Sequence, residues 1–317
     1  MTTRRWATIE AVRSQLPVRV VTNAELAPDV GWTAAEIFAK TGIAQRHVAG
    51  PEECVSDLAT AAAEKLLRDC QVNRASLQFL ILCTQTPDHF LPATACLVHA
   101  RLGLAATCAA FDINQGCSGY LYSLGLASAL VRSGMAERGL VLTGDNYTKF
   151  IHPHDRSVRT LFGDAATATL IRTGDAPGLD HFVFGTDGSG ARHLIIPAGG
   201  TRLPRSAQTA APETDSSGNV RTPNNLFMSG AHIFNFTLKR VPELFADILA
   251  RGGIGREQVD WFVFHQANRY LLDHLQQKLQ VPPEKMVRFL ENTGNTVSST
   301  IPLALEHAVA TGKFRPG

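Results

Sequence analysis

Short apolar segments rich in branched residues alternate along this chain with longer segments of helical period, and this alternation restricts the fold more than any other feature. The short segments predict β-strands at Phe79–Cys83, Ala109–Ile113, Leu140–Thr143, Thr167–Ile171 and Trp261–Phe264. The longer segments predict helices at Val55–Arg68, Ala93–Leu102, Ser118–Ser133, Ala231–Leu249 and Gln266–Leu279. Each helix is long enough to cover a sheet face, so the pattern indicates an α/β protein with a largely buried sheet.

Length and composition narrow the class of protein. A chain of 317 residues exceeds the usual domain size of roughly 100–200 residues, which favours two units. With 44% hydrophobic and 18% charged residues the chain should fold around a large core. Its formal charge of +2 is evenly spread, so we do not expect a nucleic-acid partner. We find no apolar stretch of signal-peptide or membrane-spanning length, and we expect a cytoplasmic protein without a membrane association.

Residues 198–224 read AGGTRLPRSAQTAAPETDSSGNVRTPN and lack a sustained apolar period. Their content of Ser, Thr, Pro, Ala and Gly predicts an exposed excursion from the sheet and its helices. Two interpretations stay open at this point: a lid over a site, or a mobile surface loop without function.

Cys117 follows a predicted strand and a Gln115-Gly116 turn, and a predicted helix begins directly after it. Unpaired N–H groups and the helix dipole at such a position favour a thiolate, which is the attacking form of cysteine. The same N–H groups, including that of Cys117, can hold an oxyanion, while Gly116 and Gly119 leave room for a thioester. The alternative is a packed cysteine at a helix start.

The other cysteines lack this setting. No Cys-x-x-Cys pair occurs among the six, so neither disulfides nor a structural zinc site is supported. We expect the remaining five to pack in the core; they are Cys54, Cys70, Cys83, Cys96 and Cys108.

Two further residues stand where a strand meets a helix in the second half. The apolar segment WFVF leads into His265, at the end of a sheet where α/β proteins bind ligands. The segment GNTVSST places Asn295 in a polar turn before an apolar helix, although a simple turn and N-cap would use the same residues. Each half therefore carries a strand, a reactive residue and a helix, which suggests a duplication.

These three residue types suit one chemistry. A cysteine thiolate can attack an acyl thioester and store the acyl group. Neutral His and Asn can then each donate a hydrogen bond to the carbonyl oxygen of a second thioester. If that thioester is malonyl, loss of carbon dioxide leaves an enolate, which the two donors stabilise. Neither a metal nor a redox cofactor is required.

Several separated motifs, in order, resemble the β-ketoacyl-acyl-carrier-protein synthase III family of thiolase-fold condensing enzymes. They are LPVRVVTNAEL, KTGIAQRHVAG at 40–50, FLPATACLVHARLGL, DINQGCSGY around Cys117, HDRSVRTLFGDAATATLI at 154–171, HQAN at 265–268 and GNTVSSTIPLAL at 294–305. The resemblance covers essentially the whole chain and implies that Cys117, His265 and Asn295 form the catalytic set.

The resemblance also implies a five-layered αβαβα thiolase fold from two similar halves, 1–172 with the nucleophile and 173–317 with His and Asn, and a homodimer. Members normally continue beyond GKFRPG into a strand, a Gly-rich loop and a final strand, and we expect that the sequence given omits this hairpin. By resemblance the substrate-binding residues are Arg156, Asn268, Leu91 and Phe162.

Two positions depart from the family pattern. Members that use coenzyme A primers commonly carry a Trp shortly before the Lys/Arg-Thr-Gly-Ile motif, to stack on the adenine, and Glu36 stands there in this chain. The Arg that usually follows HQAN by two places is Tyr270 here. These changes favour an acyl-carrier protein for at least one substrate, while coenzyme A stays open. Candidate contacts for an acidic carrier are Lys239, Arg240, Arg269 and Lys278.

The resulting hypothesis is an acyltransferase that condenses an acyl thioester primer with malonyl-acyl-carrier protein, as in the initiation of fatty acid or polyketide synthesis. The acyl and malonyl thioesters are substrates, and no cofactor is expected. One alternative is a related acyltransferase that forms an ester or amide on a specialised metabolite. Another is a non-catalytic partner subunit of a second synthase. A cysteine hydrolase is disfavoured, because no carboxylate is evident to orient His265.

Overall fold

The structure is a computed structural model that describes residues 5–314. Its main feature is a five-stranded mixed sheet in the order β1-β7-β6-β4-β5. The strands are β1 (Trp6–Gln15), β4 (Phe79–Cys83), β5 (Ala109–Ile113), β6 (Arg138–Asp145) and β7 (Ala165–Gly174). Strands β5, β4 and β6 run parallel, whereas β7 runs antiparallel to both β6 and β1. The carboxyl ends of β4, β5 and β6 therefore lie along one edge of the sheet.

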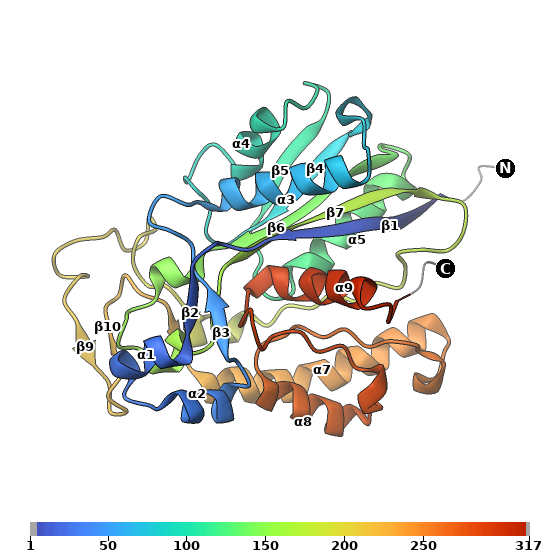
Figure 1. Cartoon of the computed structure of the whole chain (residues 1–317). Coiled ribbons are helices and arrows are strands. Elements are labelled where there is room, and N and C mark those ends of the chain that lie inside the picture. Colours follow the sequence, from blue (N-terminus) through green and yellow to red (C-terminus); the bar gives the residue numbers. More distant parts are fainter. Residues whose placement is uncertain (1–4, 315–317) are drawn as a thin grey trace.

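Helices and short strand pairs surround this sheet (Figure 1). The helices are α1 (Asn23–Val30), α2 (Ala34–Thr41), α3 (Val55–Asp69), α4 (Thr94–Arg101), α5 (Gly119–Arg132), α6 (Arg156–Arg159), α7 (Gly230–Gly252), α8 (Arg269–Leu279) and α9 (Thr300–Ala310). The short pairs are β2 (Val20–Thr22) with β3 (Gln45–His47), β8 (Leu194–Ile195) with β11 (Phe227–Met228), and β9 (Glu213–Thr214) with β10 (Val220–Arg221). The five predicted helices are confirmed, with ends displaced by three residues or fewer.

Alternation along the strands divides the core into two faces. In β4, Leu80 and Leu82 point to the face covered by α3 and α4. Phe79 and Ile81 point to the opposite face, which α5 and α9 cover. All five residues of β4 are buried, which explains why this strand is a continuous apolar segment in the sequence.

The predicted strand at Trp261–Phe264 is wrong as a ladder strand. Within residues 5–314 it forms only an isolated bridge, between Phe262 and Met286. The buried side chain of Gln266 replaces ladder hydrogen bonds: its Nε2 donates to the carbonyl of Phe264 at 2.7 Å, and its Oε1 accepts from the N–H of Phe289 at 2.9 Å. An amide side chain thus satisfies backbone groups that a neighbouring strand would otherwise pair.

The same segment nevertheless separates two helical layers. Trp261 and Val263 pack toward α9, whereas Phe262 packs with Leu272 of α8 on the other side. Figure 1 accordingly shows α3 and α4, the sheet, α5 and α9, this extended segment, and finally α7 and α8. The layers follow the αβαβα order that the family resemblance implies, with this extended segment in the place of the second β layer. The division into two similar halves at residue 172 stays a prediction.

Backbone pairing joins the end of the first half to the turn that holds Asn295. The N–H of Asn295 donates to the carbonyl of Leu161 at 2.9 Å, and the N–H of Gly163 donates to the carbonyl of Asn295 at 3.1 Å. A Cβ on Gly163 would lie 2.3 Å from the carbonyl oxygen of Thr293. This contact allows no side chain, so the close approach that places Asn295 depends on a glycine.

We predict that Gly163→Ala lowers the free energy of unfolding by about 1–3 kcal/mol, because backbone must move to accept the methyl group. Gly185→Ala is the matched control, since a Cβ there meets no atom within 4 Å. The control should stay within about 0.5 kcal/mol of the parent in urea denaturation. Equal stability of the two variants would contradict the close approach.

Candidate active site

The carboxyl edge of the three parallel strands gathers several polar residues. Gln85 follows β4, Cys117 follows β5, and Asp145 ends β6. The N–H of Gln85 donates to Asp145 Oδ1 at 2.8 Å, and the hydroxyl of Tyr147 donates to Gln85 Oε1 at 2.6 Å. These hydrogen bonds hold together the ends of β4 and β6 at the sheet edge where Cys117 lies.

Cys117 lies two residues before α5, with Ser118 at the N-cap. The residue is partly exposed and packs against an apolar cluster that includes Phe162 and Val297. Burial, together with the nearby charge of Asp145, raises the pKa of the thiol to about 12, although its own N–H favours the thiolate. Burial and the helix terminus therefore act in opposite directions on this thiol, and the expectation that the helix start favours the thiolate stays a prediction.

Asn295 is buried and its amide has a defined orientation. Its Oδ1 accepts a hydrogen bond from the N–H of Val297 at 3.0 Å. Because a backbone N–H can only donate, this bond assigns the oxygen and leaves the NH₂ group as the outward donor. Val297 has φ of +54°, an unusual conformation for a β-branched residue. Such strain at a site residue is consistent with a functional constraint on this turn.

His265 is half-buried, and its imidazole has one hydrogen-bond partner among residues 5–314. Its Nδ1 lies 2.7 Å from Oγ1 of Thr300, at the start of α9. Burial lowers the pKa of His265 to about 4, so the imidazole is neutral at physiological pH. In the described residues no carboxylate hydrogen-bonds to it, and the ring can act as a neutral donor through one nitrogen.

One short turn links the three predicted residues. Ser298 donates to Asp145 Oδ2 through its hydroxyl at 2.5 Å and through its N–H at 3.3 Å, which holds residues 295–300 against the end of β6. Within this turn Val297 belongs to the cluster against which Cys117 packs, and Thr300 contacts His265. The structure thus brings the surroundings of Cys117, His265 and Asn295 together at one edge.

The predicted substrate-binding residues fall in different surroundings. Phe162 is 3% exposed and belongs to the same cluster as Val297, next to Cys117. Leu91 is 83% exposed, in a loop after β4. Asn268 caps α8, its Oδ1 accepting from the N–H of Leu271 at 2.8 Å. Phe162 alone of these three packs in the cluster next to Cys117, and the binding roles of all three stay predictions.

Arg156 points to a residue that the sequence analysis missed. Its guanidinium lies 5.2 Å from the ring centroid of Trp32, and the ammonium of Lys40 lies 5.0 Å from the same ring. Glu36, where the family resemblance leads us to expect a Trp, instead closes a capping box with Thr33. An aromatic ring therefore does lie beside Arg156, and it belongs to Trp32, four residues before Glu36. The sequence alone does not show that Trp32 and Arg156 are neighbours.

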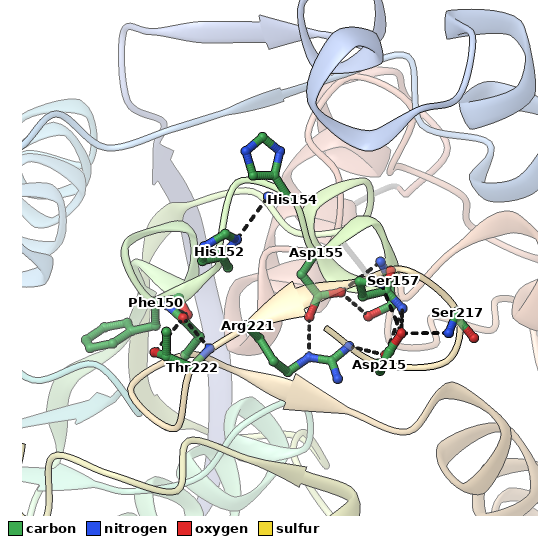
Figure 2. Close-up of polar contacts among 11 residues, drawn as sticks. Phe150, His152, His154, Asp155, Ser157, Asp215, Ser217, Arg221 and Thr222 are labelled. Atoms are coloured by element: carbon green, nitrogen blue, oxygen red, sulfur yellow. Dashed lines mark hydrogen bonds and ion pairs between the residues drawn. The ribbon is translucent and has the colours of Figure 1, made fainter. Parts of the chain in front are cut away.

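Residues 198–224 are anchored rather than free along their length. Arg221 donates to the buried carboxylate of Asp155 at 2.7 Å and to Asp215 at 2.8 Å (Figure 2). Arg156 also donates to the carbonyl of Ser217. The segment also carries the β9–β10 pair, and its contacts place this end beside Arg156. Both interpretations, a lid over a site or a mobile surface loop without function, stay predictions.

The four predicted carrier contacts divide into two pairs. Lys239 and Lys278 line a surface hollow of about 540 Å³ between α7 and α8. Arg240 pairs with Asp187 at 3.2 Å and Glu243 at 2.9 Å. Arg269 donates to the carbonyls of Phe38 and Ala39 at the end of α2. Lys239 and Lys278 have no ion-pair partner within residues 5–314, which leaves their charge available to an acidic surface.

Membrane-spanning helices and metal-binding groups are both absent from residues 5–314. From residue 5 to residue 314, no helix combines the length and apolar character needed to cross a bilayer. Over the same residues, no group of three or more His, Cys, Asp or Glu side chains could hold a metal ion.

Comparisons with known proteins agree with the geometry. Residues 111–188 match the family described as 3-oxoacyl-[acyl-carrier-protein (ACP)] synthase III, and residues 249–317 match its C-terminal domain. The β-ketoacyl-[acyl-carrier-protein] synthase III 3 of Streptomyces coelicolor is 39% identical, over 99% of this chain and 91% of that protein. The chain belongs to the 3-oxoacyl-[acyl-carrier-protein] synthase III family. The first matched segment contains Cys117, and the second contains His265 and Asn295.

Solved structures of the synthase III family confirm the predicted thiolase fold. A crystal structure of a 3-oxoacyl-(acyl-carrier-protein) synthase III has a TM-score of 0.95 and 47% identity, covering 98% of this chain and 94% of that one. The priming β-ketosynthase of the R1128 polyketide pathway has a TM-score of 0.87 and 30% identity, covering 100% and 91%.

We predict that alkylation of Cys117 by iodoacetamide keeps accelerating about tenfold per pH unit up to at least pH 10.5. Thiolate is the reactive form, and a raised pKa postpones its appearance. A cysteine in an unstructured peptide, with a pKa of ~8.5, should level off by about pH 9.5. Peptide mass spectrometry after brief exposure measures each rate. A plateau for Cys117 below pH 9 would mean that the helix terminus outweighs burial.

Proposed function

We propose that this chain catalyses the decarboxylative Claisen condensation of an acyl thioester primer with malonyl-acyl-carrier protein, releasing a β-ketoacyl thioester. The observation that supports this most is the pair of neutral donors: the NH₂ of Asn295, oriented by the N–H of Val297, and His265, kept uncharged by burial. Both lie on or against the turn that packs beside Cys117. Relatives named as synthase III and as a priming ketosynthase support the same reaction.

The first step transfers the primer. The sulfur of Cys117 attacks the thioester carbonyl, and a tetrahedral oxyanion forms beside the N–H of Cys117. The carrier thiol leaves with the proton that Cys117 gives up, and the acyl group stays on the sulfur. The cluster that contains Phe162 and Val297 offers an apolar surface for an acyl chain.

The second step makes the carbon–carbon bond. The malonyl carboxylate leaves as carbon dioxide, and the electrons of the broken bond pass into an enolate. Asn295 and His265 donate hydrogen bonds to the enolate oxygen as its charge develops. The enolate carbon then attacks the carbonyl of acyl-Cys117, and the sulfur leaves as a thiolate that takes a proton from water. The reaction needs thioesters alone, with no cofactor.

Charge explains why neutral donors serve better than a base. A carboxylate beside the enolate would raise its energy, and in the described residues none hydrogen-bonds to His265. The same feature disfavours a cysteine hydrolase, which needs an activated water. No observation favours ester or amide synthesis, or a non-catalytic subunit, over condensation.

For the substrates, we propose that acyl-carrier protein docks over the hollow lined by Lys239 and Lys278. The primer carrier can be coenzyme A or a carrier protein. Trp32 and Arg156 lie side by side and are of the residue types on which an adenine stacks, which supports coenzyme A as one possible primer carrier.

For assembly, we propose a homodimer. Within residues 5–314 strand β5 has a neighbour on one side only, and a second copy can pair with its open edge. Leu121 and Leu126 of α5 are 43% and 45% exposed, as expected of an apolar surface that a partner covers. All six cysteines are free, which agrees with the reducing cytoplasm that we propose as its location.

We predict that Cys117→Ala abolishes the acyl-enzyme seen by intact mass spectrometry, whereas Asn295→Ala keeps it. Asn295→Ala should slow release of labelled carbon dioxide from malonyl-carrier protein by about 10²–10³-fold, because one enolate donor is lost. Exposed Asn292→Ala is the matched control and should retain parental rates. Full acylation of Cys117→Ala would refute the nucleophile. Absence of labelled carbon dioxide with the parent enzyme would refute condensation.

We predict that the double variant Lys239→Glu and Lys278→Glu raises the KM for malonyl-carrier protein about tenfold with kcat within twofold, since surface charges act mainly on encounter. Malonyl-pantetheine, which lacks the protein surface, should be used equally well by variant and parent. Exposed Lys313→Glu is the control. An equal loss with both malonyl donors would place the effect inside the site instead of at a docking surface.

A further inference from the structure

Among the residues that the structure describes, Thr300 is the one whose side chain hydrogen-bonds to the imidazole of His265. It is 2% exposed and begins α9, so its hydroxyl cannot exchange its partners for water. Oγ1 lies 2.7 Å from His265 Nδ1 and 3.2 Å from the carbonyl oxygen of Val297. A hydroxyl has one hydrogen, so it can donate to only one of these two atoms at a time.

The distances favour donation to His265. Hydroxyl bonds to oxygen normally span about 2.5–3.0 Å, and the contact with Val297 lies beyond that range. The contact with Nδ1 has the length of a strong bond. If the hydrogen lies toward Nδ1, that nitrogen carries a lone pair and the ring hydrogen must be on Nε2.

The alternative assignment gives the opposite chemistry. If Thr300 donated to Val297, Nδ1–H would donate to Thr300, and Nε2 would present a lone pair. A lone pair facing an enolate oxygen repels it, so the ring could not stabilise the charge. Protonation of both nitrogens is disfavoured, since burial lowers the pKa of His265 to about 4. The tautomer therefore decides whether His265 is a donor at all.

We propose that Thr300 is a positioning residue: its hydroxyl donates to Nδ1 of His265 and thereby fixes the tautomer whose Nε2–H points to the reacting thioester. This inference rests on the proposed condensation and assigns a role to a residue outside the three predicted ones. The turn that carries Thr300 also orients Asn295, through the N–H of Val297. A single segment, residues 295–300, thus determines which atom of Asn295 and which nitrogen of His265 carries the donated hydrogen.

The hydrogen assignment can be tested without any reaction. Long-range ¹H–¹⁵N correlation on the whole enzyme labelled with ¹⁵N-histidine distinguishes the two neutral tautomers, and His265→Gln identifies the signal of His265 among eleven histidines. We expect a protonated Nε2 and an unprotonated, hydrogen-bonded Nδ1 at pH 7.5. A protonated Nδ1 would overturn the proposal, whether or not the enzyme condenses thioesters.

The kinetic test compares Thr300→Val, which keeps the shape and removes the hydroxyl, with Thr300→Ser, which keeps the hydroxyl. Thr300→Val should lower kcat for malonyl decarboxylation about 10- to 100-fold, less than the ~10²–10³-fold cost of deleting a donor outright. KM and the rate of Cys117 acylation should stay within threefold of the parent, and Thr300→Ser should recover decarboxylation to within threefold.

Two results would overturn the role of Thr300. One is decarboxylation by Thr300→Val within threefold of the parent, and the other is an equally slow Thr300→Ser. Acylation of Cys117 reports folding of each variant, and if Thr300→Val does not fold, the tautomer measurement and Thr300→Ser decide the question. A parent enzyme that releases no labelled carbon dioxide would instead refute the proposed function and leave the tautomer result standing.

Discussion

The carboxylate of Asp145 is the contact on which the rest of the site depends. It is fully buried at the end of β6 and receives hydrogen bonds from Gln85 after β4 and from Ser298 in the second half of the chain. Burial raises its pKa to about 7, although the hydrogen bonds from Ser298 and Gln85 act in the opposite direction. A buried carboxylate that lost these donors would be strongly destabilising. The contact therefore fixes the 295–300 turn against the sheet edge that carries Cys117.

Desolvation has opposite consequences for the two titratable groups of the site. It raises the pKa of Cys117, which lowers the resting reactivity of the thiol. It lowers the pKa of His265, which keeps the imidazole neutral, and it strengthens any hydrogen bond to a developing negative charge. A site that stabilises an enolate by donors alone needs the second effect. The raised pKa of Cys117 is an unfavourable consequence of the same exclusion of water.

Local sequence signals were sufficient for much of the fold. The strand Phe79–Cys83 and the helix that begins at Val55 follow from continuous and periodic apolar patterns, because burial on both faces or on one face leaves a direct trace in the sequence. Trp261–Phe264 misled because its apolar alternation is real, while within residues 5–314 its backbone pairing is limited to the bridge at Phe262 and Gln266 satisfies the carbonyl of Phe264. The periodicity of a segment reports burial, and it does not report which groups satisfy the backbone.

Contacts between distant segments explain what the sequence could not reveal about the site. Trp32 lies four residues before Glu36, and only the folded chain shows that its ring lies 5.2 Å from the guanidinium of Arg156. Thr300 looks like an ordinary helix-start residue until the fold brings His265 within 2.7 Å. Cys117 likewise packs against a cluster that includes Phe162 and Val297, which neither precede nor follow it closely.

The strained backbone at Val297 connects these observations. A valine at φ of +54° is unfavourable by about 1–3 kcal/mol, and glycine would remove that strain. Its side chain, however, is 1% exposed and belongs to the cluster beside Cys117, while its N–H orients Asn295. The residue thus needs both a left-handed backbone, to direct its N–H, and a branched side chain, to exclude water. These two requirements explain why an unfavourable residue type occupies the turn between the two donors.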